Sequence, residues 1–78
     1  MHYNTIYNKL EIKLKQYLGY KWHLITNKTR NYIYSAAMEN DILPMEIKWA
    51  EYVDSLIIFT SKGFLLFDTY SLYSFSDN

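Results

Sequence analysis

The chain has 78 residues, of which half are hydrophobic and 19% aromatic, and its eight basic and eight acidic residues give a formal net charge of zero. This length fits a single compact domain spanning residues 1–78, and the aromatic content excludes an intrinsically disordered chain. There is no cysteine, which excludes disulfides, thiolate metal sites and a cysteine nucleophile. Without a long apolar run or a signal-peptide pattern, we expect neither a membrane span nor export, and therefore a cytoplasmic protein.

The zero net charge conceals two halves of opposite sign. Residues 1–30 carry six basic residues and one acidic residue, a net charge of +5, and residues 31–78 carry two basic and seven acidic residues, a net charge of −5. The sequence leaves open whether the two halves are both exposed or pair with each other inside the fold.

The first predicted element is an amphipathic helix from about Thr5 to Leu18. Apolar side chains recur there at spacings of three and four residues. The stripe consists of Tyr3, Tyr7, Leu10, Leu14 and Tyr17. Gly19 follows, and it supplies the left-handed residue that ends many helices.

Three strands are predicted next. The segment "YKWHLIT" (20–26) alternates apolar and polar side chains, which is typical of a strand. The segment "YIYSAAMEN" (32–40) suits either a strand ending near Ala36 or a helical turn, and we favour the strand. After Pro44, "MEIKWAEYVD" (45–54) reads as a strand or as a helix. We favour the strand, because Leu43 cannot cap a helix; we expect Trp49 in the core and Tyr52 exposed.

The segment "LIIFTSKGFLLF" (56–67) predicts a β-hairpin, with Gly63 in a turn that needs a positive φ. The final alternating segment "DTYSLYSFS" (68–76) predicts an edge strand. Together these elements predict an α+β domain in which one main N-terminal helix packs on a four- to five-stranded antiparallel sheet.

The sequence offers little for catalysis. Its histidines are His2 and His23, its two glycines have structural roles, and no nucleophile elbow, phosphate loop or zinc motif occurs. We therefore expect a protein that is not an enzyme, with no cofactor and no metal site.

Two kinds of binding surface remain. A basic, aromatic set suits single-stranded nucleic acid, because bases stack on rings and cations follow phosphates. It comprises Lys21, Trp22, Lys28, Arg30 and Tyr32. The zero net charge argues against it, since phosphate contacts drive such binding. An acidic, aromatic set suits a protein partner instead. It comprises Glu39, Asp41, Glu46, Glu51, Tyr52 and Asp54.

The acidic set suggests imitation of DNA. Alternate residues on one face of a strand stand ~6.6 to 6.8 Å apart, a spacing comparable to that of successive phosphates. Carboxylates in such a row can enter the cationic groove of an enzyme that handles DNA.

Four segments occur in an order that resembles the staphylococcal uracil-DNA glycosylase inhibitor family. They are "LEIKLKQYL" (10–18), "KW" (21–22), "DILP" (41–44) and the hairpin "LIIFTSKGFLLF" (56–67). The resemblance implies a small α+β protein that imitates the DNA backbone with acidic side chains and shelters an apolar residue of the enzyme in a hydrophobic pocket. The segment before "DILP" departs from the family, because it carries Lys28 and Arg30 and, as its acid, only Glu39. What the resemblance carries over is therefore Asp41, together with the general notion that four further carboxylates occupy a phosphate-like row. These are Glu39, Glu46, Glu51 and Asp54.

We predict a non-catalytic inhibitor of a DNA-processing bacterial enzyme, with uracil-DNA glycosylase as the named target. The richness in Asn, Lys, Ile and Tyr indicates an AT-rich gene, as in phages or mobile elements of low-GC bacteria. The alternatives are an accessory single-strand-binding module and an anti-defence inhibitor of a nuclease. Tyr-rich strand edges also leave a homodimer open. No membrane partner is expected.

Overall fold

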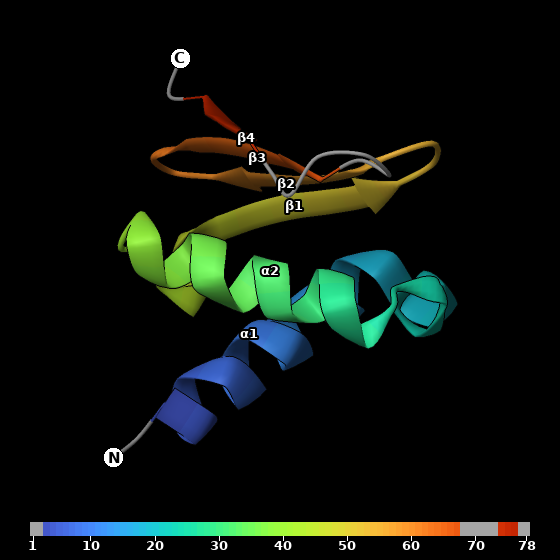
Figure 1. The fold of residues 1–78 in the computed structure, drawn as a ribbon, viewed down its shortest axis with the longest axis horizontal. Coiled ribbons are helices and arrows are strands. Elements are labelled where there is room, and N and C mark those ends of the chain that lie inside the picture. The colour runs from blue at the N-terminus through green and yellow to red at the C-terminus, as the bar shows by residue number, and fades with distance from the viewer. Residues whose placement is uncertain (1–2, 68–73, 77–78) are drawn as a thin grey trace.

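The computed structural model describes residues 3–67 and 74–76. In chain order the elements are helix α1 (Tyr3–Leu18), the 3-10 helix η1 (Gly19–Leu24), helix α2 (Asn27–Glu39), the 3-10 helix η2 (Pro44–Glu46), and strands β1 (Ile47–Tyr52), β2 (Leu56–Thr60), β3 (Gly63–Phe67) and β4 (Ser74–Ser76). Both α-helices lie on the same side of the sheet (Figure 1). The predicted α+β class and the long N-terminal helix are confirmed.

The sheet has the order β1-β2-β3-β4, and every neighbouring pair is antiparallel. The predicted hairpin forms β2 and β3, with Leu56 opposite Phe67 and Thr60 opposite Gly63. Gly63 has φ +145°, and the Thr60 hydroxyl donates to its carbonyl oxygen at 2.8 Å. Most of the predicted final strand, residues 68–73, lies outside the described residues.

Two predicted strands are wrong, so the predicted set of four to five strands is not confirmed. Residues 20–24 belong to η1, and residues 32–39 belong to α2. Thr26 caps α2, because its side-chain oxygen accepts a hydrogen bond from the Thr29 N–H at 3.2 Å. The buried face of α2 consists of Ile33, Ala36 and Ala37. These positions follow helical spacing, which outweighed the local alternation of Tyr32 and Tyr34.

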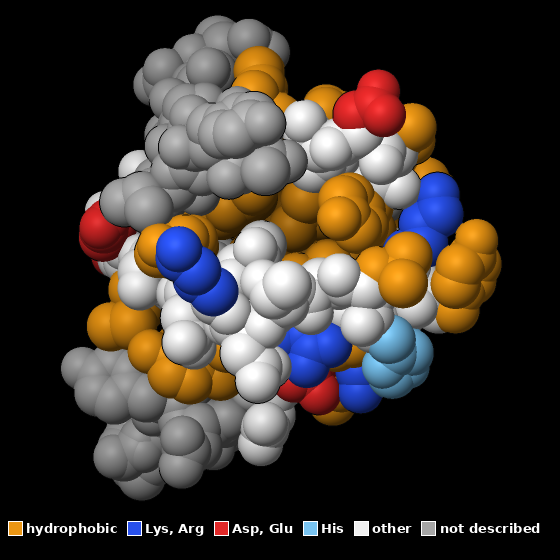
Figure 2. All heavy atoms as spheres, turned by 45° about the vertical axis from the view of Figure 1, so that its right-hand side comes forward, with side chains coloured by type: hydrophobic (Ala, Val, Ile, Leu, Met, Phe, Trp, Pro, Cys, Tyr) orange, Lys and Arg blue, Asp and Glu red, His pale blue; other side chains and the backbone are white. Residues whose placement is uncertain are grey.

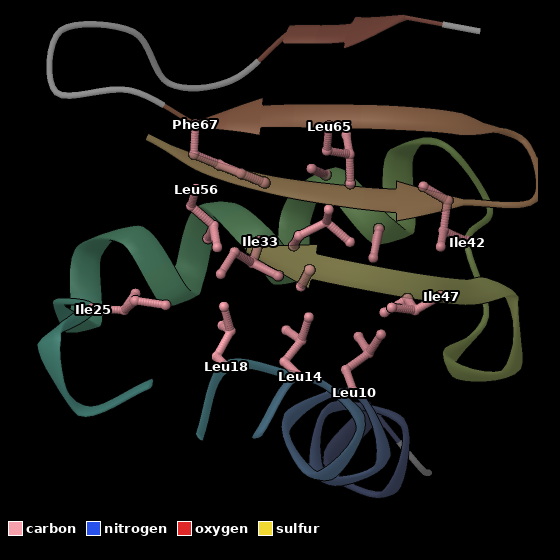
Figure 3. Packing of buried hydrophobic residues seen from close by; sticks show 14 of the residues in the cluster. Leu10, Leu14, Leu18, Ile25, Ile33, Ile42, Ile47, Leu56, Leu65 and Phe67 are labelled. Atoms are coloured by element: carbon pink, nitrogen blue, oxygen red, sulfur yellow. The ribbon is translucent and has the colours of Figure 1, made fainter. Parts of the chain in front are cut away.

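The core fills the space between the two helices and the inner face of the sheet (Figure 3). Leu10, Leu14 and Leu18 point from α1 toward the strands, and Ile33 approaches them from α2. The largest buried side chain is that of Trp22 in η1, which is 1% exposed. The second helix therefore supplies cover that the predicted single helix lacked.

The expected roles of Trp49 and Tyr52 are reversed. Trp49 is 49% exposed, whereas Tyr52 is half-buried against the core. The register between β1 and β2 shifts between Ile47 and Trp49, which is a β-bulge. The extra residue leaves Ile47 and Ala50 buried and turns Lys48 and Trp49 outward.

No helix within residues 3–67 and 74–76 has the length and apolar character needed to span a membrane.

Candidate partner-binding site

The acidic residues of the predicted site do not follow one strand. Glu39 ends α2, Asp41 lies in the loop after it, and Glu46 belongs to η2. Glu51 lies on β1 and Asp54 in the turn that follows. On the face shown in Figure 2, the acidic side chains stand apart from one another. The evenly spaced row expected on a strand is therefore not formed, because Glu39, Asp41 and Glu46 lie before β1, in α2, in the following loop and in η2.

A pocket of about 220 Å³ lies between α1, the C-terminal end of α2 and the loop after it. It is lined by Ile6, Leu10, Ala37, Met38, Asp41, Ile42 and Leu43. Leu10, Ala37 and Ile42 are buried, whereas Met38 and Leu43 are 46% and 50% exposed. Since a cavity of ~150 Å³ accommodates benzene, this pocket has room for one branched or aromatic side chain.

The loop that forms one wall of the pocket has a defined helix-ending geometry. The Ile42 N–H donates to the Ala37 carbonyl oxygen at 2.8 Å, and the Asp41 N–H donates to the Met38 carbonyl oxygen at 3.3 Å. Asp41 has φ +53°. This is a Schellman motif with aspartate at the left-handed position that glycine usually occupies. It buries Ile42 and leaves Asp41 and Leu43 on the surface.

Asp41 is the acidic residue of the pocket. Its side chain is exposed, and among the described residues its carboxylate forms no hydrogen bond or ion pair. The C-terminal end of α2, which carries partial negative charge, lies directly before it. The pocket therefore combines an apolar wall with one outward negative charge.

Glu46 has internal partners instead. One of its oxygens accepts a hydrogen bond from the Leu43 N–H at 2.7 Å, and the other accepts one from the Ser61 hydroxyl at 3.3 Å. The Lys62 ammonium lies 3.6 Å from the first oxygen. The Leu43 N–H, more than Lys62, lowers the pKa of Glu46 below its ordinary value. Glu46 thus holds the loop, and both of its carboxylate oxygens have partners within the domain.

The other predicted contact residues lie on β1 and in the turn after it. The Trp49 indole N–H donates to Glu51 at 3.2 Å, and the Trp49 ring lies 5.2 Å from the Tyr17 ring. The Tyr52 carbonyl oxygen accepts a hydrogen bond from the Lys21 ammonium at 3.0 Å. Glu51, Tyr52 and Asp54 therefore have surroundings on β1 and in the turn after it, and none of them lines the pocket.

The predicted nucleic-acid set does not form a stacking surface. Trp22 is buried, and the Arg30 guanidinium lies 4.4 Å from its ring centre and donates to its carbonyl oxygen at 2.9 Å. Lys21 is bound to Tyr52, and Tyr32 is half-buried against the core. Lys28 is exposed. The ring best suited to stack on a base is thus inside the protein.

Two ion pairs within the described residues bear on whether the charged halves pair with each other. The ion pairs Lys15–Glu11 and Lys62–Glu46 each join groups of the same half. In the described part of the chain, no group of three or more His, Asp or Glu side chains is arranged to hold a metal ion. His23 is exposed in η1.

Comparisons of the chain with protein-family models, with curated proteins and with solved structures find no match.

Sequence reasoning did not identify the apolar wall of the pocket. Ile6 and Leu10 belong to a helix that was predicted, but Met38 and Ala37 lie on α2, which was not. The one local signal was the "DILP" motif, because Asp41, Ile42 and Leu43 all line the pocket.

Proposed function

We propose that the chain is a non-catalytic binding protein that inhibits a DNA-processing enzyme by receiving an apolar side chain of that enzyme in the pocket beside Asp41. The observation that carries the proposal is the lining of the pocket, where Asp41, Ile42 and Leu43 stand together. These residues belong to the motif that resembles the glycosylase inhibitor family, and that family shelters an apolar enzyme residue in a hydrophobic pocket.

The pocket supports such a contact energetically. Full burial of an aliphatic side chain contributes about 1.5–3 kcal/mol, and the exposed Met38 can adjust its shape to the incoming group. Asp41 at the rim favours a partner segment in which lysine or arginine flanks the apolar residue. Enzymes that act on DNA present such cations, because they contact phosphates.

The proposal moves the centre of the interface away from β1. Glu39 and Asp41 lie beside or near the pocket, whereas Glu51 and Asp54 lie at the far end of the strand. Uracil-DNA glycosylase remains the named target through the resemblance. A nuclease of a defence system is the second target class, since it offers the same cationic surface.

The direct test is titration of the protein into a uracil-DNA glycosylase assay with uracil-containing duplex DNA. We expect inhibition that saturates near equimolar protein, and at least a tenfold weaker effect of Leu43→Lys, which places a cation at the pocket mouth. Val53→Lys is the matched control, because Val53 is exposed in the turn after β1. Full enzyme activity in a stoichiometric excess of the wild-type chain would reject this enzyme as the target.

Binding to labelled single-stranded DNA, measured over a range of salt concentrations, separates the alternative function. Affinity that falls steeply with salt indicates phosphate contacts and favours a nucleic-acid-binding module. No binding leaves the two inhibitor functions, which assays of glycosylase and nuclease activity then distinguish.

A further inference from the structure

The wall of the pocket is tied to the tip of the β2–β3 hairpin, which lies far from it in the sequence. Ser61 and Lys62 form this tip, and both contact the segment 41–46. The Ser61 N–H also donates to the Glu46 carbonyl oxygen at 2.9 Å. The tip of the hairpin thereby holds the segment 41–46 in place.

Glu46 and Lys62 contact different parts of the loop. The Glu46 carboxylate accepts a hydrogen bond from the Leu43 N–H at 2.7 Å. The Lys62 ammonium donates to the Asp41 carbonyl oxygen and also forms an ion pair with Glu46. The bonds therefore flank Ile42, whose own N–H is fixed to Ala37. All three loop residues that line the pocket, Asp41, Ile42 and Leu43, are held through their backbones.

We propose that Glu46 and Lys62 are positioning residues that keep the pocket open, so that the hairpin tip controls whether the pocket accepts an apolar group. For its effect on a partner enzyme this inference rests on the proposed function, but its effect on the pocket does not.

Charge supports the assignment. The Lys62 side chain is 42% exposed and that of Glu46 19%, and an ion pair at the surface contributes little to overall stability. We therefore expect the pair to act mainly through the backbone groups that it holds. Lys62 forms an ion pair with Glu46, and it donates a hydrogen bond to the carbonyl oxygen of Asp41 and not to its carboxylate. The Asp41 carboxylate therefore stays outward beside the pocket. Loss of Lys62 would free the loop and leave Glu46 without its counter-charge.

The test measures the pocket with benzene as the probe, followed by NMR of the Met38 and Leu43 methyl groups. We expect the wild-type chain to bind benzene, and Lys62→Met and Glu46→Ala to weaken this binding at least fivefold. Hydrogen exchange of the Leu43 amide should become at least tenfold faster in both variants. Lys48→Met is the matched control, since Lys48 is an exposed lysine of β1, and Lys62→Arg should restore benzene binding.

A purely structural role makes a different prediction. It would lower the urea midpoint of Lys62→Met in step with its benzene binding, whereas a positioning role leaves that midpoint close to the midpoint of Lys48→Met. The inference is overturned if the wild-type pocket excludes benzene, if both variants bind it like the wild type, or if the midpoint falls in parallel. Enzyme inhibition is scored separately. An inactive wild type with a normal benzene response would reject the proposed function alone.

Discussion

The chain contains two Lys-Trp pairs, and the fold treats them in opposite ways. Lys21 and Trp22 lie in the 3-10 helix η1, where Trp22 is 1% exposed. Lys48 and Trp49 lie on β1, where Trp49 is 49% exposed. Each pair follows an apolar residue, Tyr20 or Ile47, so the same local pattern accompanies a helix in one case and a strand in the other. The residues on either side of each pair decide whether its tryptophan is buried or exposed.

Around Trp22 the constraints come from the ends of two helices. Gly19 has φ +59° and ends α1, and Thr26 caps α2 a few residues later. The short connection turns tightly and directs Trp22 inward, where Arg30 covers its ring. Around Trp49 the constraint is the bulge after Ile47, which turns the indole outward against Tyr17.

Replacing each tryptophan by alanine breaks this comparison most directly. We expect Trp22→Ala to lower the free energy of unfolding by about 3–5 kcal/mol, because it empties the centre of the core. Trp49→Ala should cost about 1 kcal/mol, since its ring is half in solvent. Urea denaturation followed by circular dichroism measures both. If Trp22→Ala leaves no folded protein, Trp22→Phe gives the smaller loss that can still be compared. Equal losses at the two sites would contradict the assignment of Trp22 to the core.

Arg30→Met tests the group that covers Trp22. The guanidinium donates to the Trp22 carbonyl oxygen at 2.9 Å and stacks on the indole, so its removal should cost about 1–2 kcal/mol. The Arg30 Nε atom is buried, and among the described residues it has no hydrogen-bond partner, which offsets part of that loss. Lys28→Met, at an exposed position of the same helix, should have a much smaller effect. An unchanged free energy of unfolding in Arg30→Met would show that the fold does not depend on the contact between Arg30 and the Trp22 ring.

Gly19→Ala tests the turn that separates η1 from α1. A side chain at this left-handed position should cost about 1 kcal/mol. Beyond the neighbouring residues and the local helical backbone, no heavy atom lies within 4 Å of the position that a Cβ would occupy, so the loss reports the backbone conformation. Thermal unfolding measures it, and an unchanged or raised midpoint would mean that η1 does not depend on Gly19.

Acid titration of Glu46→Gln gives the smallest expected difference and sharpens the contrast between the two regions. The pKa of Glu46 is lowered from its ordinary value of 4.5, so the unfolded chain binds more protons just below that pH. The stability that Glu46 provides is therefore present above about pH 4.5 and is lost as the pH falls through the folded-state pKa. The side-chain bonds at η1 run from Lys21 and Arg30 to backbone carbonyl oxygens, and no carboxylate takes part in them.

The measurement is urea unfolding at several pH values between neutrality and pH 3. The wild-type chain should lose more stability below pH 4.5 than Glu46→Gln does. Parallel losses in the two chains would indicate that other carboxylates control the acid limb.

The elements that sequence reasoning placed correctly have patterns that their own residues complete. The stripe of Leu10 and Leu14 predicts α1, and the apolar runs around Gly63 predict the β2–β3 hairpin, because each pattern fixes one face of one element. The second helix was missed although Ile33, Ala36 and Ala37 follow helical spacing, since tyrosines among them also suit a strand. Of the candidate site, only Asp41 and the other residues of the "DILP" motif could be identified from the sequence.

What the sequence by itself determined is therefore local: the α+β class, the first helix, the hairpin and the acidic character of residues 39–54. What only the tertiary structure decided is which side chains meet. The pocket combines residues of α1, α2 and the loop after it, and a lysine from the hairpin holds that loop. Contacts between residues this distant in sequence leave no periodic signal in the chain, because they depend on how the elements pack and not on the spacing within any one of them.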